Sequence, residues 1–521
     1  MIEQQSEVHA IDLYGPKKRG KRRRQRNKVV RQARQQMQEL QRQEADEALP
    51  QRRYGWGGRR GDNRLFGLRD AVVPGVPSTA HTSATAYPFV AGPSLGLNGV
   101  WLGEEVHGGG AFLADPWALY ERGLISGMSC LLFGTVGSGK SSLAKSWAMR
   151  LVLAGRKLSV PSDLKGEWVP VVEALGGSVI QVAPGFPTRL NPLDEGQRPN
   201  LNQQGQPMGD REWASIVQQR RSMMLGTIVR IIRGNRELDD HEAGALRHAL
   251  LDAENVAQQE GRQPIIPDVR NELLRMRAVE ESEALHEMRL AADKLQLALE
   301  TVESGELSGM FDGPSTVTMD GDSPAVVIDT SAVRYASPVA SRIVSACCGA
   351  WMEAMISEDD GQRIVVYEEG WDSISNEADL ERMMKGWKLA RHYGVFNILI
   401  LHKVTDLDTA GGQGSRQAAM AQSLLADADI KIVYRQDRAA LRATHEKLEL
   451  SSEEQVLLQK MPKGSGLWRV KNSTFEVENI LTEAEKPVLD TDQRMGKEQE
   501  KQPAPARGWL AEDKEAVLVG G

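Results

Sequence analysis

The chain has 521 residues, enough for two or three structural units, and its formal net charge at pH 7 is only −7. No apolar stretch of about 18 residues or more is free of charge, so the sequence predicts no membrane-spanning helix. The first residues are polar and lack an apolar stretch, so we expect no secretory signal and a cytoplasmic protein. A peripheral position at the inner face of a membrane stays open.

The three cysteines, Cys130, Cys347 and Cys348, have neither the spacing of a metal site nor that of a disulfide framework. Cys130 lies in a short apolar run, and the other two lie within a helical pattern. We therefore expect three buried structural thiols in a reducing compartment.

Residues 1–54 are expected to form a basic arm without a core. The block 17–28 is so dense in Lys and Arg that like charges repel and favour disorder, and residues 29–48 could form a single exposed helix. Such a block suits DNA phosphates or an anionic lipid surface, while a solvated tail without a specific partner is the alternative. Residues 55–96 are rich in Gly, Pro and Ser and predict a linker.

A phosphate-binding loop is predicted where the apolar run 128–133 meets the pattern Gly134-x-x-x-x-Gly139-Lys140-Ser141, directly before a helical pattern. Glycines let the backbone curl so that its N–H groups face phosphate oxygens, and the helix N-terminus adds partial positive charge. We expect ATP here, with Lys140 on the β- and γ-phosphates and the Ser141 hydroxyl on Mg²⁺. The residues expected to contact the nucleotide are Gly134, Thr135, Val136, Gly137, Ser138, Gly139, Lys140, Ser141 and Ser142.

The order of the remaining patterns predicts an α/β core interrupted by an all-α insertion. Residues 97–205 alternate strand and helix patterns, which favours a mostly parallel sheet with ligands at the carboxyl ends of its strands. Residues 206–300 carry apolar positions at helix spacing only. Residues 301–485 return to strands and helices, and residues 486–521 predict a disordered tail. Strands are expected at 99–103, 157–160, 178–182, 325–329, 363–367, 395–401 and 430–434, with a closing hairpin at 467–470 and 474–477.

Two carboxylates, Glu368 and Glu369, end the apolar strand 363–367 and complete the expected chemistry. We expect Glu368 to organise Mg²⁺ and Glu369 to orient or deprotonate the attacking water. The alternative is an exposed acidic turn.

Arg391 is the arginine that we expect from a neighbouring subunit to stabilise phosphoryl charge. Arg435 and Arg438 are further candidates, and a plain surface role is the alternative for each. His402-Lys403 is either a γ-phosphate sensor or a helix cap.

Together these residues resemble the cytoplasmic motor ATPases of conjugation and type IV secretion. This TraC-like class belongs to the FtsK–HerA group of P-loop NTPases with a RecA-like core, and the chain resembles its actinobacterial ATP-binding branch. The resemblance implies a hexameric ring that hydrolyses ATP at subunit interfaces, contains an all-α insertion and works with membrane-associated transfer machinery. The motifs that carry it are Phe112–Trp117, Gly134–Ser141, Asp163–Trp168, Leu190–Pro192, Gly309–Gly313, Glu368–Trp371, Ala390-Arg391 and Gly464–Trp468.

The chain departs from that family in three places. Glu368 stands where the family has Asp, and the usual Thr-Gln pair is replaced near His402-Lys403. A short linker and basic arm stand in place of a large N-terminal domain. The sequence therefore supports an ATP-driven motor for DNA or protein transfer, with two alternatives: a nucleotide-gated scaffold that binds DNA or a membrane surface, and a HerA- or FtsK-like DNA translocase.

Overall fold

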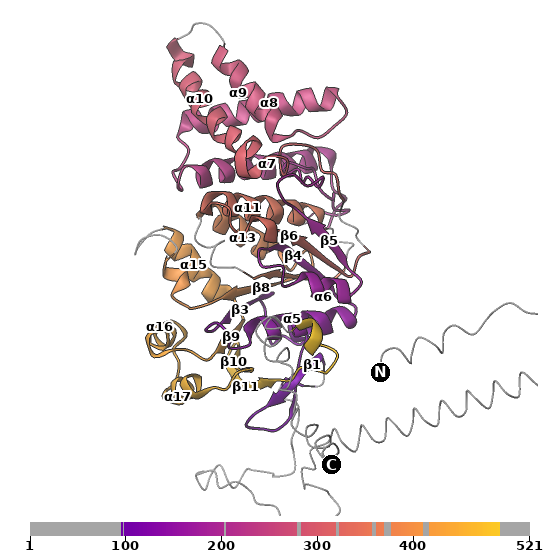
Figure 1. Cartoon of the computed structure of the whole chain (residues 1–521), viewed down its shortest axis with the longest axis vertical. Helices are drawn as coiled ribbons and strands as arrows, with labels where there is room; N and C mark the ends of the chain where they lie inside the picture. The colour runs from indigo at the N-terminus through magenta and orange to yellow at the C-terminus, as the bar shows by residue number, and fades with distance from the viewer. Residues whose placement is uncertain are drawn as a thin grey trace, which may run out of the picture. The chain divides into compact units, whose positions relative to one another are not determined.

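The computed structural model describes residues 95–96, 98–202, 205–278, 283–318, 322–356, 361–368, 377–409 and 416–489. All of them belong to one compact unit, Phe89–Gly521 (Figure 1). The predicted arm 1–54, nearly all of the linker 55–96, and Glu369 lie outside the described residues.

The described residues form a single 11-stranded sheet in the order β2-β1-β11-β10-β9-β3-β8-β7-β4-β6-β5. From β9 to β5 every neighbouring pair is parallel, whereas β10, β11, β1 and β2 pair antiparallel at one side. The prediction of a mostly parallel sheet is confirmed. The strands are β1 Val100–Glu105, β2 Ala111–Ala114, β3 Ser129–Phe133, β4 Lys157–Asp163, β5 Ser178–Gln181, β6 Ala325–Asp329, β7 Arg363–Tyr367, β8 Val395–Leu401, β9 Ile430–Tyr434, β10 Ser465–Val470 and β11 Ser473–Asn479.

Helices cover both faces of the sheet (Figure 1), which explains why its strands are continuous apolar runs. Cys130 and Leu132 of β3 pack in the cluster that includes α5, whereas Leu131 and Phe133 point to the opposite face and pack with α15 to α17. The three cysteine side chains are buried, as expected, and none of them forms a disulfide. The helices are α4 Pro116–Glu121, α5 Lys140–Leu153, α6 Val169–Ala174, α7 Asp210–Ile232, α8 Asp240–Gln259, α9 Ile266–Ala278, α10 Glu283–Glu303, α11 Pro338–Met355, α13 Glu377–Leu389, α14 Asp406–Thr409, α15 Arg416–Asp427, α16 Arg438–Leu448, α17 Ser452–Lys460 and α18 Lys486–Leu489, with short 3-10 turns at Gly305–Leu307 and Ser331–Val333.

Central strand β3 lies between β8 and β9. Cys130 is in register with Ile398 on one side and with Ile430 on the other. Strand β7 follows β8, so a single strand separates β3 from β7. Because these strands are parallel, the residues that follow β3, β8 and β7 meet at one edge of the sheet.

The insertion consists of α7, α8, α9 and α10, and they pack with α11 and with strands β5 and β6 in one apolar cluster. A capping box starts α8, because Asp239 accepts from the Glu242 N–H at 2.8 Å and Glu242 accepts from the Asp239 N–H at 3.2 Å. None of the described helices is long and apolar enough to cross a membrane.

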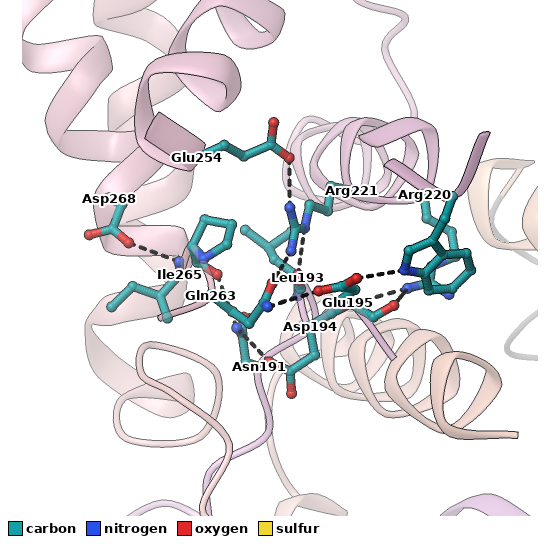
Figure 2. Close-up of polar contacts among 12 residues, drawn as sticks. Asn191, Leu193, Asp194, Glu195, Arg220, Arg221, Glu254, Gln263, Ile265 and Asp268 are labelled. Carbon is teal, nitrogen blue, oxygen red and sulfur yellow. Dashed lines mark hydrogen bonds and ion pairs between the residues drawn. The ribbon is translucent and has the colours of Figure 1, made fainter. Parts of the chain in front are cut away.

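A buried polar network fastens the insertion to the loop after β5 (Figure 2). The Arg221 guanidinium donates to the Leu193 carbonyl and to Glu254, both at 2.7 Å, and also to Gln263. The fully buried Asn191 amide donates to Asp194 at 2.9 Å and to the Pro264 carbonyl at 3.0 Å. The Leu190–Pro192 motif therefore holds the insertion in place rather than lying at the phosphate-binding loop.

The described core extends past the predicted boundary at residue 485. Residues Lys486–Leu489, which we assigned to the disordered tail 486–521, form the short helix α18, and Leu489 is buried against the core. Charged composition suggested disorder here, but composition does not reveal the ion pair between Arg150 and Glu485 that fastens this segment to α5.

Candidate nucleotide-binding site

The loop between β3 and α5 has the curled backbone that its glycines permit. Gly137 and Gly139 have φ angles of +76° and +109°, in the left-handed region where residues other than glycine are strained. A Cβ atom on Gly139 would also lie 3.2 Å from the Cα of Gly464. Both the conformation and the limited space at position 139 therefore favour glycine.

Neighbouring strand ends hold this loop in position. The Gly134 N–H donates to the His402 carbonyl after β8 at 3.3 Å, and the Thr135 N–H donates to the Arg435 carbonyl after β9 at 3.4 Å. The Gly464 N–H, just before β10, donates to the Ser138 carbonyl at 3.0 Å. Three neighbouring segments therefore hold the loop by backbone hydrogen bonds.

Lys140, the first residue of α5, places its ammonium group inside the curl of the loop. The residue is 5% exposed, and its Nζ donates to the carbonyls of Gly134 and, at 3.0 Å, of Thr135. Backbone N–H groups at the start of α5 add the partial positive charge of a helix N-terminus. Together these groups suit a phosphate anion.

The structure brings Ser141 and Glu368 together, although they are 227 residues apart in the chain. The Ser141 hydroxyl donates to one carboxylate oxygen of Glu368 at 2.7 Å, and the Trp168 indole N–H donates to the other at 3.0 Å. Burial raises the pKa of Glu368 above its ordinary value, although these hydrogen bonds and the nearby Lys145 favour the charged form.

The loop after β4 supports this contact. Asp163 accepts hydrogen bonds from the backbone N–H groups of Glu167 at 3.2 Å and Trp168 at 2.7 Å, and it is buried with a raised pKa because desolvation disfavours its charge. Glu167 in turn pairs at 2.9 Å with Lys145, a lysine of α5 that is only 1% exposed. We predicted no role for Lys145, and Trp168 entered only as the last residue of the Asp163–Trp168 motif. The one available signal was a lysine inside the apolar pattern of α5.

A cavity of about 790 Å³ opens beside these groups, within the ~300–1,000 Å³ range of small-molecule sites. Phosphate-loop residues, Glu368 and His402 all line it. The hydroxyl of Ser141 and the carboxylate of Glu368 are hard oxygen donors of the kind Mg²⁺ prefers. Among the described residues no group of three or more His, Cys, Asp or Glu side chains converges.

The other predicted site residues are placed as follows. Ser142 is half-buried and Val136 is 83% exposed, and both residues line the cavity. Arg391 is exposed before the start of β8, at the opposite edge of the sheet from the loop and on the order of 20 Å away along a seven-residue strand. Arg435, which we ranked below Arg391, contacts the loop through its backbone carbonyl. Glu369 lies outside the described residues.

No protein-family model and no curated protein sequence matches the chain. Among solved structures, VirB4 of Thermoanaerobacter pseudethanolicus is 20% identical, with 76% of this chain and 99% of that chain covered and a TM-score of 0.60. The plasmid coupling protein TrwB in complex with the GTP analogue GDPNP is 13% identical, with 68% and 86% covered and a TM-score of 0.45. The genome packaging NTPase B204 from Sulfolobus turreted icosahedral virus 2, in complex with AMPPCP, is 11% identical, with 70% and 100% covered and a TM-score of 0.28.

Of these three similarities, the TM-scores of TrwB and B204 are too low to carry an argument. The similarity to VirB4, which runs over nearly all of that chain, shows a common fold. This chain has a run of parallel strands from β9 to β5 and a glycine-rich loop between β3 and α5. This chain therefore has a RecA-like P-loop NTPase fold.

Proposed function

We propose that the chain binds ATP with Mg²⁺ at the loop Gly134–Ser141 and hydrolyses it. The observation that carries this proposal is the 2.7 Å contact between Ser141 and Glu368, beside the buried ammonium group of Lys140. Phosphoryl transfer at a P-loop site requires a loop that binds the phosphates and an acidic residue at the end of a neighbouring strand. Lys140 and Ser141 belong to the first of these, and Glu368 is the second.

Each residue has one role in this proposal. The loop N–H groups and Lys140 bind the β- and γ-phosphates, and Ser141 with Glu368 holds the metal ion. Mg²⁺, when bound, neutralises the phosphate charge that develops during transfer. Trp168 fixes the Glu368 carboxylate by its N–H donor. Glu369, the next residue along the chain, orients the attacking water and accepts its proton.

We further propose that the chain is a TraC-like motor that energises DNA or protein transfer in a conjugation- or type IV secretion-like system. The ordered set of motifs, the RecA-like fold and the all-α insertion between β5 and β6 support this assignment. Because Arg391 lies at the far edge of the sheet from its own phosphate loop, its proposed role requires a second subunit, as in a hexameric ring. The basic block 17–28 is the proposed contact with DNA or anionic lipid at the inner face of a membrane.

A second candidate is a nucleotide-gated scaffold with little turnover. The observation that favours it is Glu368 itself, whose longer side chain closes onto both Ser141 and Trp168. A HerA- or FtsK-like DNA translocase is the third candidate, and turnover that rises on addition of double-stranded DNA would favour it.

The test is Mg²⁺-dependent ATP turnover of the wild type, Lys140→Ala and Glu369→Gln. We expect turnover in the wild type, loss of ATP binding in Lys140→Ala, and retained binding with turnover lowered at least 100-fold in Glu369→Gln, since general-base catalysis contributes about 10²–10⁴-fold. Light scattering of the same samples with and without ATP reports ring formation. Equal background release by all three proteins would remove the enzyme proposal, and tight binding without turnover in the wild type would favour the scaffold.

A further inference from the structure

The cavity beside the phosphate loop has a second wall, made by the last described residues of the chain. We name residues 480–489 the C-terminal strap. Leu481, Lys486, Pro487 and Leu489 of the strap line the same cavity as Lys140 and Ser141. Nothing in the P-loop motif itself accounts for this wall, because the strap lies about 340 residues further along the sequence.

The strap is fastened to helix α5 by one arginine. Arg150, in the last turn of α5, donates to the two carboxylate oxygens of Glu485 at 2.7 and 2.6 Å, and both side chains are about nine-tenths buried. The same guanidinium donates to the carbonyls of Ile480 at 2.7 Å and Trp101 at 2.6 Å. Such a bidentate, buried pair fixes position as well as contributing energy.

Hydrogen bonds within the strap fix its local shape. Thr482 donates its N–H to Glu485 at 2.8 Å, and the Leu489 N–H donates to the Glu485 carbonyl at 2.9 Å. Leu489 is then buried in the core cluster, while Leu481 is half-buried and Pro487 is exposed. The strap is thus a hydrogen-bonded turn, and its apolar side chains Leu481 and Pro487 line the cavity.

The strap contributes three apolar residues to this wall, Leu481, Pro487 and Leu489, beside one lysine, Lys486, so the wall is more apolar than the phosphate loop. Phosphates are strongly hydrated anions, and apolar side chains cannot replace their water. A nucleobase is planar, and its faces are apolar enough to gain from contact with a proline ring and a leucine. A cavity with cationic and N–H groups on one wall and apolar groups on another therefore suits a nucleotide that lies with its phosphates on the loop and its base on the strap.

We propose that the C-terminal strap is the nucleobase subsite of this cavity, with Leu481 and Pro487 in contact with the base and Arg150–Glu485 as the fastening. This inference rests on the proposed binding of ATP at Gly134–Ser141. The phosphate loop then binds a nucleotide and a phosphate chain that lacks a base. Contact with the strap makes the site bind the nucleotide more tightly of the two.

The test compares ATP with inorganic tripolyphosphate, which lacks base and ribose, by calorimetric titration in the presence of Mg²⁺. We expect the wild type to bind ATP more tightly than tripolyphosphate. The double variant Leu481→Ala with Pro487→Ala is expected to bind ATP about tenfold more weakly, the scale of losing one or two apolar contacts, and to bind tripolyphosphate as the wild type does. The control is Leu153→Ala, since Leu153 is a 79% exposed leucine of α5 outside the cavity lining, and it should change neither affinity.

A second variant tests the fastening. Glu485→Gln keeps the size of the side chain and removes its charge, and it should show the same selective loss of ATP affinity. Unchanged ATP affinity in the double variant would overturn the inference while leaving the proposed function intact, and so would an equal loss for both ligands. A wild type that binds neither ligand would overturn the proposed function and the inference with it.

Discussion

Glu368 uses both of its carboxylate oxygens. One accepts from Ser141 and the other from Trp168, so the buried charge has a hydrogen-bond donor on each side. An aspartate at this position would be one methylene shorter and could not keep both contacts without a shift of β7. Glu368 stands where the family that the chain resembles has Asp, and its longer side chain is matched by the two hydrogen-bond donors around it.

The variant Trp168→Phe tests the role of the indole N–H. Phenylalanine retains most of the apolar ring but leaves one oxygen of Glu368 without its donor, which costs about 1–3 kcal/mol of stability. We expect the unfolding temperature to fall and a higher Mg²⁺ concentration to be needed for half-maximal ATP turnover.

The matched control for that variant is Trp147→Phe. Trp147 is equally buried, and its indole N–H donates to the Ala114 carbonyl at 3.1 Å, away from Glu368. It should lower stability without changing the Mg²⁺ requirement. The positioning role of Trp168 is contradicted if both variants leave that requirement unchanged.

Residues of the site differ in how far the sequence could predict them. The spacing Gly134 to Ser141 is local, so a pattern of eight residues was enough to predict the loop. Glu368 was predictable because a parallel strand that ends in carboxylates must deliver them to the loop edge of the sheet. Lys145 and Trp168 were not, because their partners depend on how α5 and the loop after β4 pack together.

At the scale of elements, the phosphate loop and the turn before β10 support each other through Gly139 and Gly464. Gly137 and Gly139 both have left-handed backbone, but a Cβ on Gly137 would meet no atom within 4 Å, whereas one on Gly139 would press on the Gly464 backbone. Gly137→Ala should therefore cost only the left-handed penalty, about 1–2 kcal/mol.

Gly139→Ala should cost more than that, because the backbone at Gly464 is itself held by its hydrogen bond to Ser138. Thermal unfolding of the two variants under one set of conditions is the measurement. A lower unfolding temperature for Gly139→Ala than for Gly137→Ala is the expected result. Equal unfolding temperatures would show that the contact with the β10 turn contributes nothing.

The bounds of most helices and strands could be predicted from the spacing of apolar residues in the sequence. Strands Ala325–Asp329, Val395–Leu401 and Ile430–Tyr434 have the predicted bounds, since a central strand is buried over its whole length. The end of the strap, residues 486–489, was assigned to the tail for the opposite reason. Its sequence is charged and exposed at several positions, and its place in the core depends on the distant Arg150 and on the burial of Leu489.

In the molecule as a whole, the order of the strands in the sheet brings the residues of the site together. It places β3 and β7 on either side of β8, so that residues before and after the insertion meet at one cavity. The sequence could predict a parallel sheet but not this order, because strand neighbours are chosen by long-range packing. The insertion lies between β5 and β6, where it lengthens the chain without interrupting the sheet.

A structure of the chain with Mg²⁺ and a non-hydrolysable ATP analogue would test the proposed site directly. We expect the triphosphate along the N–H groups of the loop and the ion at the Ser141 hydroxyl beside Glu368. A triphosphate bound elsewhere, or an ion remote from both Ser141 and Glu368, would contradict it.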